Sequence, residues 1–552
     1  MRSRWKLNRV SVGLMALVVT SLVAVLGAQV ASSSSNARTA SDTIVIAVPG
    51  TPQGVDLDFN SGPQTWSMAP QVLEAGLDWA RGKNPYPPAG GVDNSKIPGY
   101  TYPDFKHFNA APGYLASCEL KNGGKLALYH IRHGVKSAWG NEMTSADIYF
   151  RQARAVANKA ISAFMVNVAN AGDIKQWKAL DRYTVQITSP TPMPLICLIN
   201  TNLYWNNVPD TVELKKHITK DDPWGNKWLP FHGTYFGPYF ITKWVPGQEV
   251  RMDANPNWYK PVAIKHIIYK VVPESSNRVA LLQNGSVQLV EGLSPEDVVS
   301  LKSKPGVNVA AVRGNQSLWL EMNNLFKPFD NVKVRQAINY AIPRKEIVDQ
   351  VYRGFAQEWA GVMPSVYPGY KDFKTYSYDL AKAKKLLAEA GYPKGFNDVL
   401  AYNAGDPVQA NIAILLQSTL KKIGVDVTLS QQPPGPYSDL IQGHKFHMGI
   451  WIDFPIQPDI NYDLTLANKS GAAVNYQTYT NKQVDAILLK CLSVVGAQRI
   501  PCNQAAAKVI SDTASLGWIA EPYYLSAMSD KLAGWGWYTT QYYRVVDMKF
   551  TS

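Results

Sequence analysis

The chain has 552 residues and a formal net charge of +13, and charged residues make up 18% of it. This length is greater than one hydrophobic core can organise, so it predicts two or three domains. Aromatic residues account for 11%, with 16 Trp and 29 Tyr, which excludes a disordered protein. Five basic residues precede position 42, so the rest carries +8, scattered without a Lys/Arg-rich run. A nucleic-acid-binding protein is therefore excluded as well.

Residues 1–41 have the pattern of an export leader. The basic start MRSRWKLNR is followed by an apolar run with no further charge until Arg38. This predicts a signal peptide or an uncleaved signal anchor, with the body outside the membrane. SSSSNARTAS then reads as a flexible tether. No Cys follows the apolar run, so a lipid anchor is not expected. We predict an exported protein at the cell surface, in the periplasm or secreted.

The first half of the exported body alternates strands and helices. Strands are predicted in DTIVIAVPG, KLALYHIRHGV and DRYTVQITSP, from their β-branched alternation and turn-forming ends. Helical spacing occurs in MAPQVLEAGLDWA and in TSADIYFRQARAVANKA, the latter behind a Thr or Ser N-cap. Residues 82–114, rich in Gly, Pro and Tyr, predict a long loop. Two strands joined by a Pro-Gly turn are expected within residues 235–259.

The second half has a different pattern. Helices are predicted in NRVALLQNG, VRQAINYAI, PRKEIVDQVYRG and DLAKAKKLLAEAGY. NDVLAYNAG, QANIAILLQSTLKKIG and VDVTLSQQ then follow as strand, helix and strand. This order indicates a βαβ unit and a largely parallel sheet.

Four Cys lie in the exported body: Cys118, Cys197, Cys491 and Cys502. An even number outside the cytoplasm predicts disulfides. Cys491 and Cys502 flank LSVVGAQRIP, which reads as a helix end, a turn and a helix start, a spacing that suits a bond across a helical hairpin. We expect the bonds Cys491–Cys502 and Cys118–Cys197, although the sequence alone does not fix the connectivity.

Motifs of catalysis or of metal binding are not evident. There is no GxSxG, HExxH, Walker loop or glycine-rich dinucleotide turn. His130 and His133 fall in a predicted strand, where an i,i+3 pair points to opposite faces. His444 and His447 share a short loop without further converging ligands. We therefore expect neither an enzyme nor a cofactor nor a metal site.

The run HMGIWIDFPIQPD contains a lone carboxylate, Asp453, in an apolar and aromatic stretch without Lys or Arg. A buried unpaired charge costs several kcal/mol, so Asp453 needs a partner. A distant Lys or Arg, or a turn that Asp453 caps, would suffice. Trp66 and Trp451 lie on predicted loops or strand ends, where they could form the wall of a cleft or belong to the core.

Several segments together resemble one family. They are FDNVKVRQAINYAIPRKEIVDQVYRGFA at residues 329–356, GPYFITKWVPGQEVRMDANPNWY, LLAEAGYP, KKIGVDVTL and WGNEMTSADIYF. This set resembles the family 5 extracellular solute-binding proteins, the peptide- and nickel-type receptors of bacterial ABC importers. The resemblance covers nearly the whole exported body. Residues 82–114 look unlike the usual family spacing.

The resemblance implies an α/β fold, the two-lobed periplasmic-binding-protein fold of the class II or cluster C type. Lobe I would contain residues 42–292 and 525–552, with an extra subdomain near residues 85–232. Lobe II would contain residues 293–524. Such a protein closes on its ligand at a hinge made by two chain crossings.

The resemblance also implies a ligand site. In peptide-binding relatives, an Asp after a Trp-containing strand binds the ligand's α-amino group, and Asp453 occupies the matching place. Backbone groups of Gly449, Ile450 and Trp451 would hold an extended peptide as an added strand. Tyr402 and Asn403 belong to YNAGD, which has no Arg and is similar to the oligopeptide branch. Trp66 completes the expected set.

We therefore interpret the chain as a monomeric receptor that captures short peptides and delivers them to an ABC transporter permease, without chemistry of its own. One alternative is the same role for oligosaccharides or a metal chelate, because relatives bind these and the many Trp suit sugars. An alternative of another class is a secreted hydrolase or an extracellular sensor domain.

Overall fold

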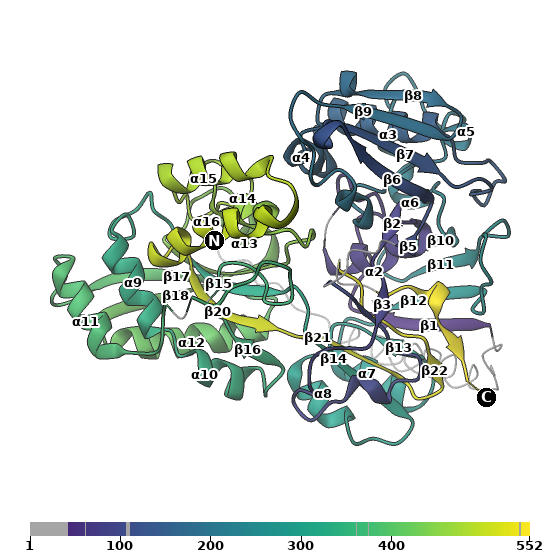
Figure 1. The fold of residues 1–552 in the computed structure, drawn as a ribbon. Coiled ribbons are helices and arrows are strands. Elements are labelled where there is room, and N and C mark those ends of the chain that lie inside the picture. The colour runs from purple at the N-terminus through teal and green to yellow at the C-terminus, as the bar shows by residue number, and fades with distance from the viewer. Residues whose placement is uncertain are drawn as a thin grey trace, which may run out of the picture.

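The computed structural model describes residues 42–60, 62–105, 111–359, 361–373, 375–539 and 543–551. The leader predicted at residues 1–41 lies outside these described residues. Within them, no helix is both long and apolar enough to cross a membrane. Figure 1 shows two bodies of mixed helices and strands, with a further sheet stacked on one of them. The predicted α/β fold class is confirmed.

The first sheet is built from both ends of the chain. In spatial order the described strands are β10 (Tyr239–Val245), β11 (Glu249–Ala254), β12 (His266–Val271), β1 (Thr43–Val48), β13 (Leu289–Val290), β21 (Tyr524–Ser529) and β14 (Val307–Val312). β1 is parallel to β12 and β13, whereas β21 is antiparallel to β13 and β14. The C-terminal segment thus returns to the sheet that the N-terminal strand begins.

The second sheet carries the predicted βαβ unit. Its described strands are β16 (Ala356–Glu358), β20 (Gly517–Pro522), β15 (Ser317–Met322), β19 (Met448–Asp453), β17 (Phe396–Asn403) and β18 (Val425–Gln432). β17 and β18 are parallel, and α12 (Pro407–Lys421) connects them. Asp406 caps the first turn of α12, and Pro407 supplies a φ angle suited to a helix start.

The third sheet forms a separate layer within the predicted subdomain, together with α3 (Ser145–Asn158) and α4 (Ile161–Val168) (Figure 1). Its described strands are β6 (Leu115–Lys121), β7 (Leu126–Ile131), β9 (Thr184–Thr188) and β8 (Trp177–Asp181). Thr144 and Asp147 form a capping box at the start of α3. The N-cap expected from TSAD is confirmed.

The remaining elements complete the described chain. The α-helices are α2 (Pro63–Val72), α5 (Thr211–Leu214), α6 (Leu229–His232), α7 (Ser275–Gln283), α8 (Pro295–Leu301), α9 (Val332–Ala341), α10 (Arg344–Glu346), α11 (Leu380–Glu389), α13 (Pro434–Gln442), α14 (Ile460–Asn468), α15 (Lys482–Leu492) and α16 (Arg499–Asp512). A π-helix covers Ile347–Val351, and short strand pairs are β2 (Leu77–Asp78) with β5 (Ala111–Pro112), β3 (Arg81–Gly82) with β4 (Tyr102–Pro103) and β22 (Leu532–Ala533) with β23 (Lys549–Phe550).

The chain passes between the first and second sheets at two places. It leaves the first sheet between β14 and β15 and returns between β20 and β21. The first crossing predicted, near residue 292, precedes α8 and β14, and β14 still belongs to the first sheet. The second crossing predicted, near residue 525, is close to Tyr523, which links β20 and β21. The residue ranges of the two lobes stay a prediction.

The helix predicted over MAPQVLEAGLDWA is only half formed. α2 begins earlier, at Pro63, and ends at Val72, after which Leu73 is extended. The backbone then approaches a distant segment so closely that a Cβ on Gly113 would lie 1.9 Å from the Ala75 carbonyl oxygen. Tertiary contact therefore overrides the helical spacing after Val72, and Leu77–Asp78 becomes a strand.

Both expected disulfides are present. Cys118 is bonded to Cys197 and Cys491 to Cys502, with Cα–Cα distances of 5.7 and 5.8 Å. The second bond joins α15 to α16, as the spacing predicted. The first bond joins β6 to the segment before the 3₁₀ turn Leu198–Thr201.

We predict that the two bonds differ in their contribution to stability. They span 79 and 11 residues, and a crosslink that closes a longer loop removes more entropy from the unfolded chain. Replacing both Cys of Cys118–Cys197 by Ala should lower the free energy of unfolding by about 4–5 kcal/mol, against about 2–3 kcal/mol for Cys491–Cys502. Urea unfolding of the two double variants measures this order. A larger loss for Cys491–Cys502 would contradict the loop-length argument.

Candidate functional site

Strands β15 and β19 present polar and aromatic side chains on one face of the second sheet. Ser317 is opposite Asp453 in the antiparallel register, and Trp319 is opposite Trp451. Because side chains alternate along a strand, Ser317, Trp319 and Glu321 share a face with Trp451 and Asp453. The run IWID thus places its carboxylate beside a second carboxylate-bearing strand.

Asp453 has no basic partner among the described residues. Its Oδ1 accepts a hydrogen bond from the Phe454 backbone N–H at 2.7 Å, and no described ion pair includes it. Burial raises the pKa of the Asp453 carboxyl to about 6. The distant Lys or Arg considered as a partner from the sequence is therefore not supplied by the described chain.

The segment after Asp453 lies against the other lobe. The rings of Trp66 and Phe454 meet edge to face, with centroids 4.1 Å apart. The Trp66 Nε1–H donates to the Tyr204 hydroxyl at 2.5 Å, and the Asn202 side-chain amide donates to the Ile456 carbonyl at 2.7 Å. Trp66 is buried, so it belongs to the hydrophobic core and also forms a wall of the junction between the lobes.

A buried ion network positions this wall. Arg151 and Arg154 of α3 each reach Asp58, at 2.9 and 2.7 Å, and Arg154 also pairs with Asp56 at 2.5 Å. Arg151 donates in addition to the Tyr204 carbonyl at 2.9 Å. All four charged side chains are shielded from solvent. The network therefore ties α3 to the loop after β1 and fixes the backbone of Tyr204.

Two further carboxyl groups lie near Asp453 without basic partners. Glu321 Oε1 accepts from Trp319 Nε1 at 2.6 Å, whereas its Oε2 has no hydrogen-bond partner among the described residues. Neither carboxyl oxygen of Asp463, on α14, has such a partner. Burial raises the pKa of Glu321 to about 8 and that of Asp463 well above its usual range. The negative charge of Asp453 also raises the pKa of both carboxyl groups by repulsion.

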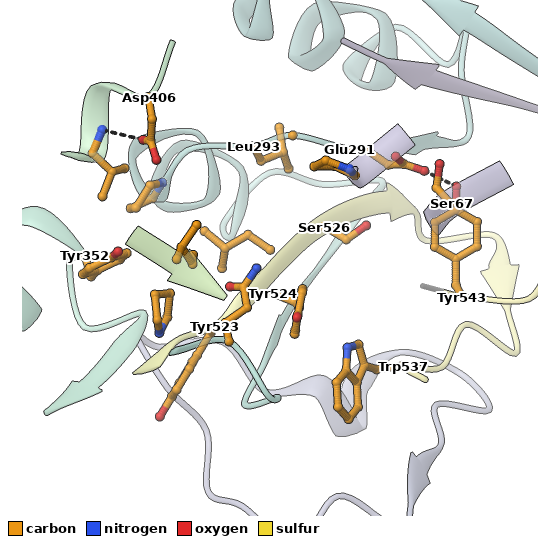
Figure 2. Close-up of a pocket in the computed structure, with 18 of the residues that line it drawn as sticks. Ser67, Glu291, Leu293, Tyr352, Asp406, Tyr523, Tyr524, Ser526, Trp537 and Tyr543 are labelled. Atoms are coloured by element: carbon orange, nitrogen blue, oxygen red, sulfur yellow. Dashed lines mark hydrogen bonds between the residues drawn. The ribbon is translucent and has the colours of Figure 1, made fainter. Parts of the chain in front are cut away.

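A cavity of about 300 Å³ opens between the two bodies, along the return crossing (Figure 2). The described residues that line it include several aromatic side chains, two acidic residues and no Lys, Arg or His. Its named walls come from both sheets: Pro63, Ser67, Glu291, Gly292, Leu293, Pro295, Gln316, Tyr352, Asp406, Val408, Ile452, Pro522, Tyr523, Tyr524, Leu525, Ser526, Trp535, Trp537 and Tyr543. Ile452 lines this cavity, whereas the side chain of Asp453, its neighbour in β19, points to the opposite face of the strand.

The two acidic groups of the cavity differ in their local roles. Asp406 caps α12 by accepting from the Val408 and Gln409 amides at 2.9 and 3.4 Å. Glu291, just after β13, accepts from the Tyr543 hydroxyl. Burial raises the pKa of both groups, that of Glu291 to about 7. Figure 2 shows Glu291 beside Ser67 and Tyr543, and Asp406 toward the opposite end.

The other residues expected from the sequence lie on β17 and β19. Gly449 and Ile450 are buried within β19, and the Ile450 carbonyl accepts from the Tyr437 hydroxyl. Trp451 is partly buried against Tyr437 and Tyr476. β17 pairs with β19 only at Met448 and Gly449, so the edge from Ile450 to Asp453 has no described neighbouring strand on that side.

Tyr402 and Asn403 end β17 and are not among the residues that line the cavity. Asp406, three positions later in the same YNAGD segment, does line it. Sequence reasoning missed Glu291, Asp406, Glu321 and Asp463. The signal available for Glu291 was its position directly after the apolar run VQLV, and for Asp406 its N-cap position before Pro407.

The expectation of no metal site concerned His130, His133, His444 and His447. Among the described residues, no group of three or more His, Cys, Asp or Glu is arranged to hold a metal ion. His133 instead stacks on Tyr183, with ring centroids 3.9 Å apart.

Known proteins of one family are similar to this chain in sequence. Residues 109–475 match the family described as bacterial extracellular solute-binding proteins, family 5, middle region. The chain is 27% identical over 308 residues to heme-binding protein A of Haemophilus influenzae, which covers 54% of this chain and 56% of that protein. It is 26% identical over 423 residues to the glutathione-binding protein GsiB of Shigella dysenteriae, which covers 73% of this chain and 79% of that protein.

Solved structures share the fold. The periplasmic binding protein DppA of Helicobacter pylori, in complex with peptide STSA, superposes with a TM-score of 0.76 at 21% identity, over 92% of this chain and 98% of that one. A dipeptide-binding protein of Pseudoalteromonas, in complex with Met-Leu, gives 0.77 at 19% identity, over 92% and 100%. These likenesses confirm the cluster C type of fold expected from the sequence.

We predict that Glu321 makes stability fall as the pH rises. Its pKa is about 8 in the folded protein against an ordinary value of 4.5, so between these values the folded state binds the extra proton. The free energy of unfolding should then decrease by up to about 1.4 kcal/mol per pH unit between pH 5 and 8. Glu321→Gln should flatten this slope, and the exposed Glu389→Gln should not. Urea unfolding at each pH measures it, and parallel curves for wild type and Glu321→Gln would contradict the assignment.

Proposed function

Because the chain belongs to family 5 of the bacterial extracellular solute-binding proteins, we propose that it captures short peptides between its two lobes and delivers them to an ABC transporter permease. The family consists of substrate-binding proteins of ABC importers rather than enzymes. The observation that carries the peptide proposal is Asp453, a carboxylate at the lobe junction with no basic partner among the described residues.

The ligand's α-ammonium supplies the missing charge in this proposal. A hydrogen bond to a charged group contributes about 1.5–3 kcal/mol, and exclusion of water by the lobes strengthens the pair. Asp453 needs such a partner because its only hydrogen bond among the described residues comes from the Phe454 amide. Trp66, which packs on Phe454, then closes over the ligand terminus.

The edge of β19 supports binding of an extended chain. From Ile450 to Asp453 the strand pairs with β15 on one side and with no described strand on the other. A peptide can add as a strand there, and the backbone hydrogen bonds of such an added strand do not depend on side-chain identity. The Ile450 carbonyl is already engaged by Tyr437, and the Trp451 backbone faces β15, so the backbone of Ile452 is the next to point to the open edge.

Capture requires the lobes to open and close. The two crossings, β14–β15 and β20–β21, supply a hinge. The contacts of Trp66 with Phe454 and of Asn202 with Ile456 hold the two lobes together in the closed form. The protein acts outside the membrane, where its two disulfides persist. We propose that it does so as a monomer.

Defined ligands test the proposal. Purified protein is titrated by calorimetry with peptides of two to five residues, with glutathione, with heme and with oligosaccharides. We expect saturable peptide binding. Saturable binding of a sugar, glutathione or heme without any response to peptides would contradict the peptide assignment and leave the receptor class intact.

We predict that Asp453→Asn lowers peptide affinity at least tenfold, which corresponds to about 1.4 kcal/mol. N-acetylation of the peptide should weaken wild-type binding by a similar factor, and the two changes should not add because they remove the same interaction. Asp426→Asn, an exposed position on β18, is the matched control and should bind normally.

The thermal midpoint of the empty Asp453→Asn protein should hold or rise, because an unpaired carboxylate has been removed from the lobe junction. Strong destabilisation with unaltered peptide affinity would instead make Asp453 a structural residue. Calorimetric titration and thermal unfolding of the same preparations separate the two results.

A further inference from the structure

The charge inside the cleft is opposite to the charge of the protein. The body carries +8, yet the cavity between the lobes is lined by Glu291 and Asp406 and by no described Lys, Arg or His. Asp453 follows Ile452 in the chain, and its side chain points to the opposite face of β19, outside this cavity. None of these three carboxyl groups takes part in a described ion pair. A site of this composition repels anions and leaves several negative charges for a ligand to neutralise.

Arg278 acts on the Glu291 carboxyl through its charge but forms no described ion pair with it. Arg278 points its guanidinium at backbone carbonyls: Nε donates to Glu291 at 2.9 Å, Nη1 to Val272 and Pro273 at 2.7 and 2.6 Å, and Nη2 to Gly292 at 2.7 Å. It therefore holds the chain around β13 in place. The Glu291 carboxyl itself faces hydroxyl groups, with Tyr543 donating to it and Ser67 beside it (Figure 2).

Resting on the proposed peptide function, we propose that the peptides bound are basic and that Glu291 receives the Lys or Arg side chain of the ligand. Asp406 is the weaker candidate, because its Oδ1 already accepts from two amides of α12. Glu291 accepts from neutral hydroxyls, which can stay in place when a cation arrives.

The walls of the cavity suit a long basic side chain. Tyr524 and Trp537 line it together with Tyr352 and Tyr523 (Figure 2). Aromatic faces pack against the methylene stem of Lys or Arg, and they attract its charged end within about 6 Å. An anionic ligand such as glutathione or heme would place carboxylates in the same acidic space, at an energetic cost.

The protonation of Glu291 gives a second readout. Burial raises the pKa of Glu291 to about 7, and the groups that face it are the hydroxyls of Tyr543, Ser67 and Tyr269 and the guanidinium of Arg278. A cationic side chain binds the ionised form, so its advantage should grow as the pH rises from 6 to 8. Comparing two peptides that share an N-terminus cancels the contribution of Asp453.

The test is competitive native mass spectrometry with an equimolar set of peptides. Each is an Ala-based peptide of two to five residues with one Lys, norleucine or Glu after the first position. Wild-type protein should retain the best Lys peptide at least tenfold over its norleucine and Glu counterparts, and the Lys-to-norleucine ratio should rise between pH 6 and 8. Glu291→Gln should bring this ratio close to one, whereas Glu389→Gln, which removes an exposed partner of Lys333, should keep it.

Each outcome decides a separate point. Equal retention of Lys and norleucine peptides, or preference for Glu, overturns the basic-ligand inference while peptide binding itself stands. A Lys preference that persists unchanged in Glu291→Gln overturns the role of Glu291. Retention of no peptide overturns the proposed function and the inference with it. If Glu291→Gln does not fold, the wild-type ratios and their pH dependence still decide whether the ligand is basic.

Discussion

A carboxylate removed from water needs a positive charge or several hydrogen-bond donors, and this requirement organises the protein on both sides of its cleft. Where structure must be fixed, the chain supplies the cations itself: Arg151 and Arg154 meet Asp56 and Asp58 at 2.5–2.9 Å. Around Asp453 it supplies none within the described residues, and Asp453 retains only the Phe454 amide. The difference separates a permanent ion network from the carboxylate that, in our proposal, a ligand neutralises.

The two kinds of carboxylate are physically connected. Arg151 donates to the Tyr204 carbonyl, the Tyr204 hydroxyl accepts from Trp66, and Trp66 packs on Phe454 next to Asp453. The paired charges thus hold the wall that covers the unpaired one. Rigid support on one side and an unsatisfied group on the other are what a receptor needs in order to close only on a ligand with the right charge.

In the site that we propose, specificity comes from charge rather than from the backbone edge. The edge of β19 offers hydrogen bonds that any extended chain can use, whereas Glu291 and Asp453 discriminate by sign. Relatives named for heme and for glutathione share the family, and the structures bound to STSA and Met-Leu share the fold. The fold therefore leaves the ligand open, and the side chains at the lobe junction decide it.

Much of the molecule followed from local sequence. The alternation in DTIVIAVPG, the strand–helix–strand order around α12 and the Cys491–Cys502 spacing each depend on neighbours in the chain, and the structure confirms all three. The lone acid in GIWID could be predicted for the same reason, because no cation lies near it in sequence.

The end of α2 at Val72 could not be predicted from the sequence, since a close approach of Gly113 to Ala75 imposes it. Nor were the other carboxyl groups: only packing brings Glu291 and Asp406 to one cavity, and only packing brings Glu321 and Asp463 near Asp453. Whether a carboxylate has a partner depends on where distant Arg side chains point, and Arg278 points at carbonyls while Arg151 points at Asp58. The sequence by itself therefore determined the elements and the isolated Asp453, and the tertiary structure decided which charges are left for a ligand, because pairing is a long-range property of the fold.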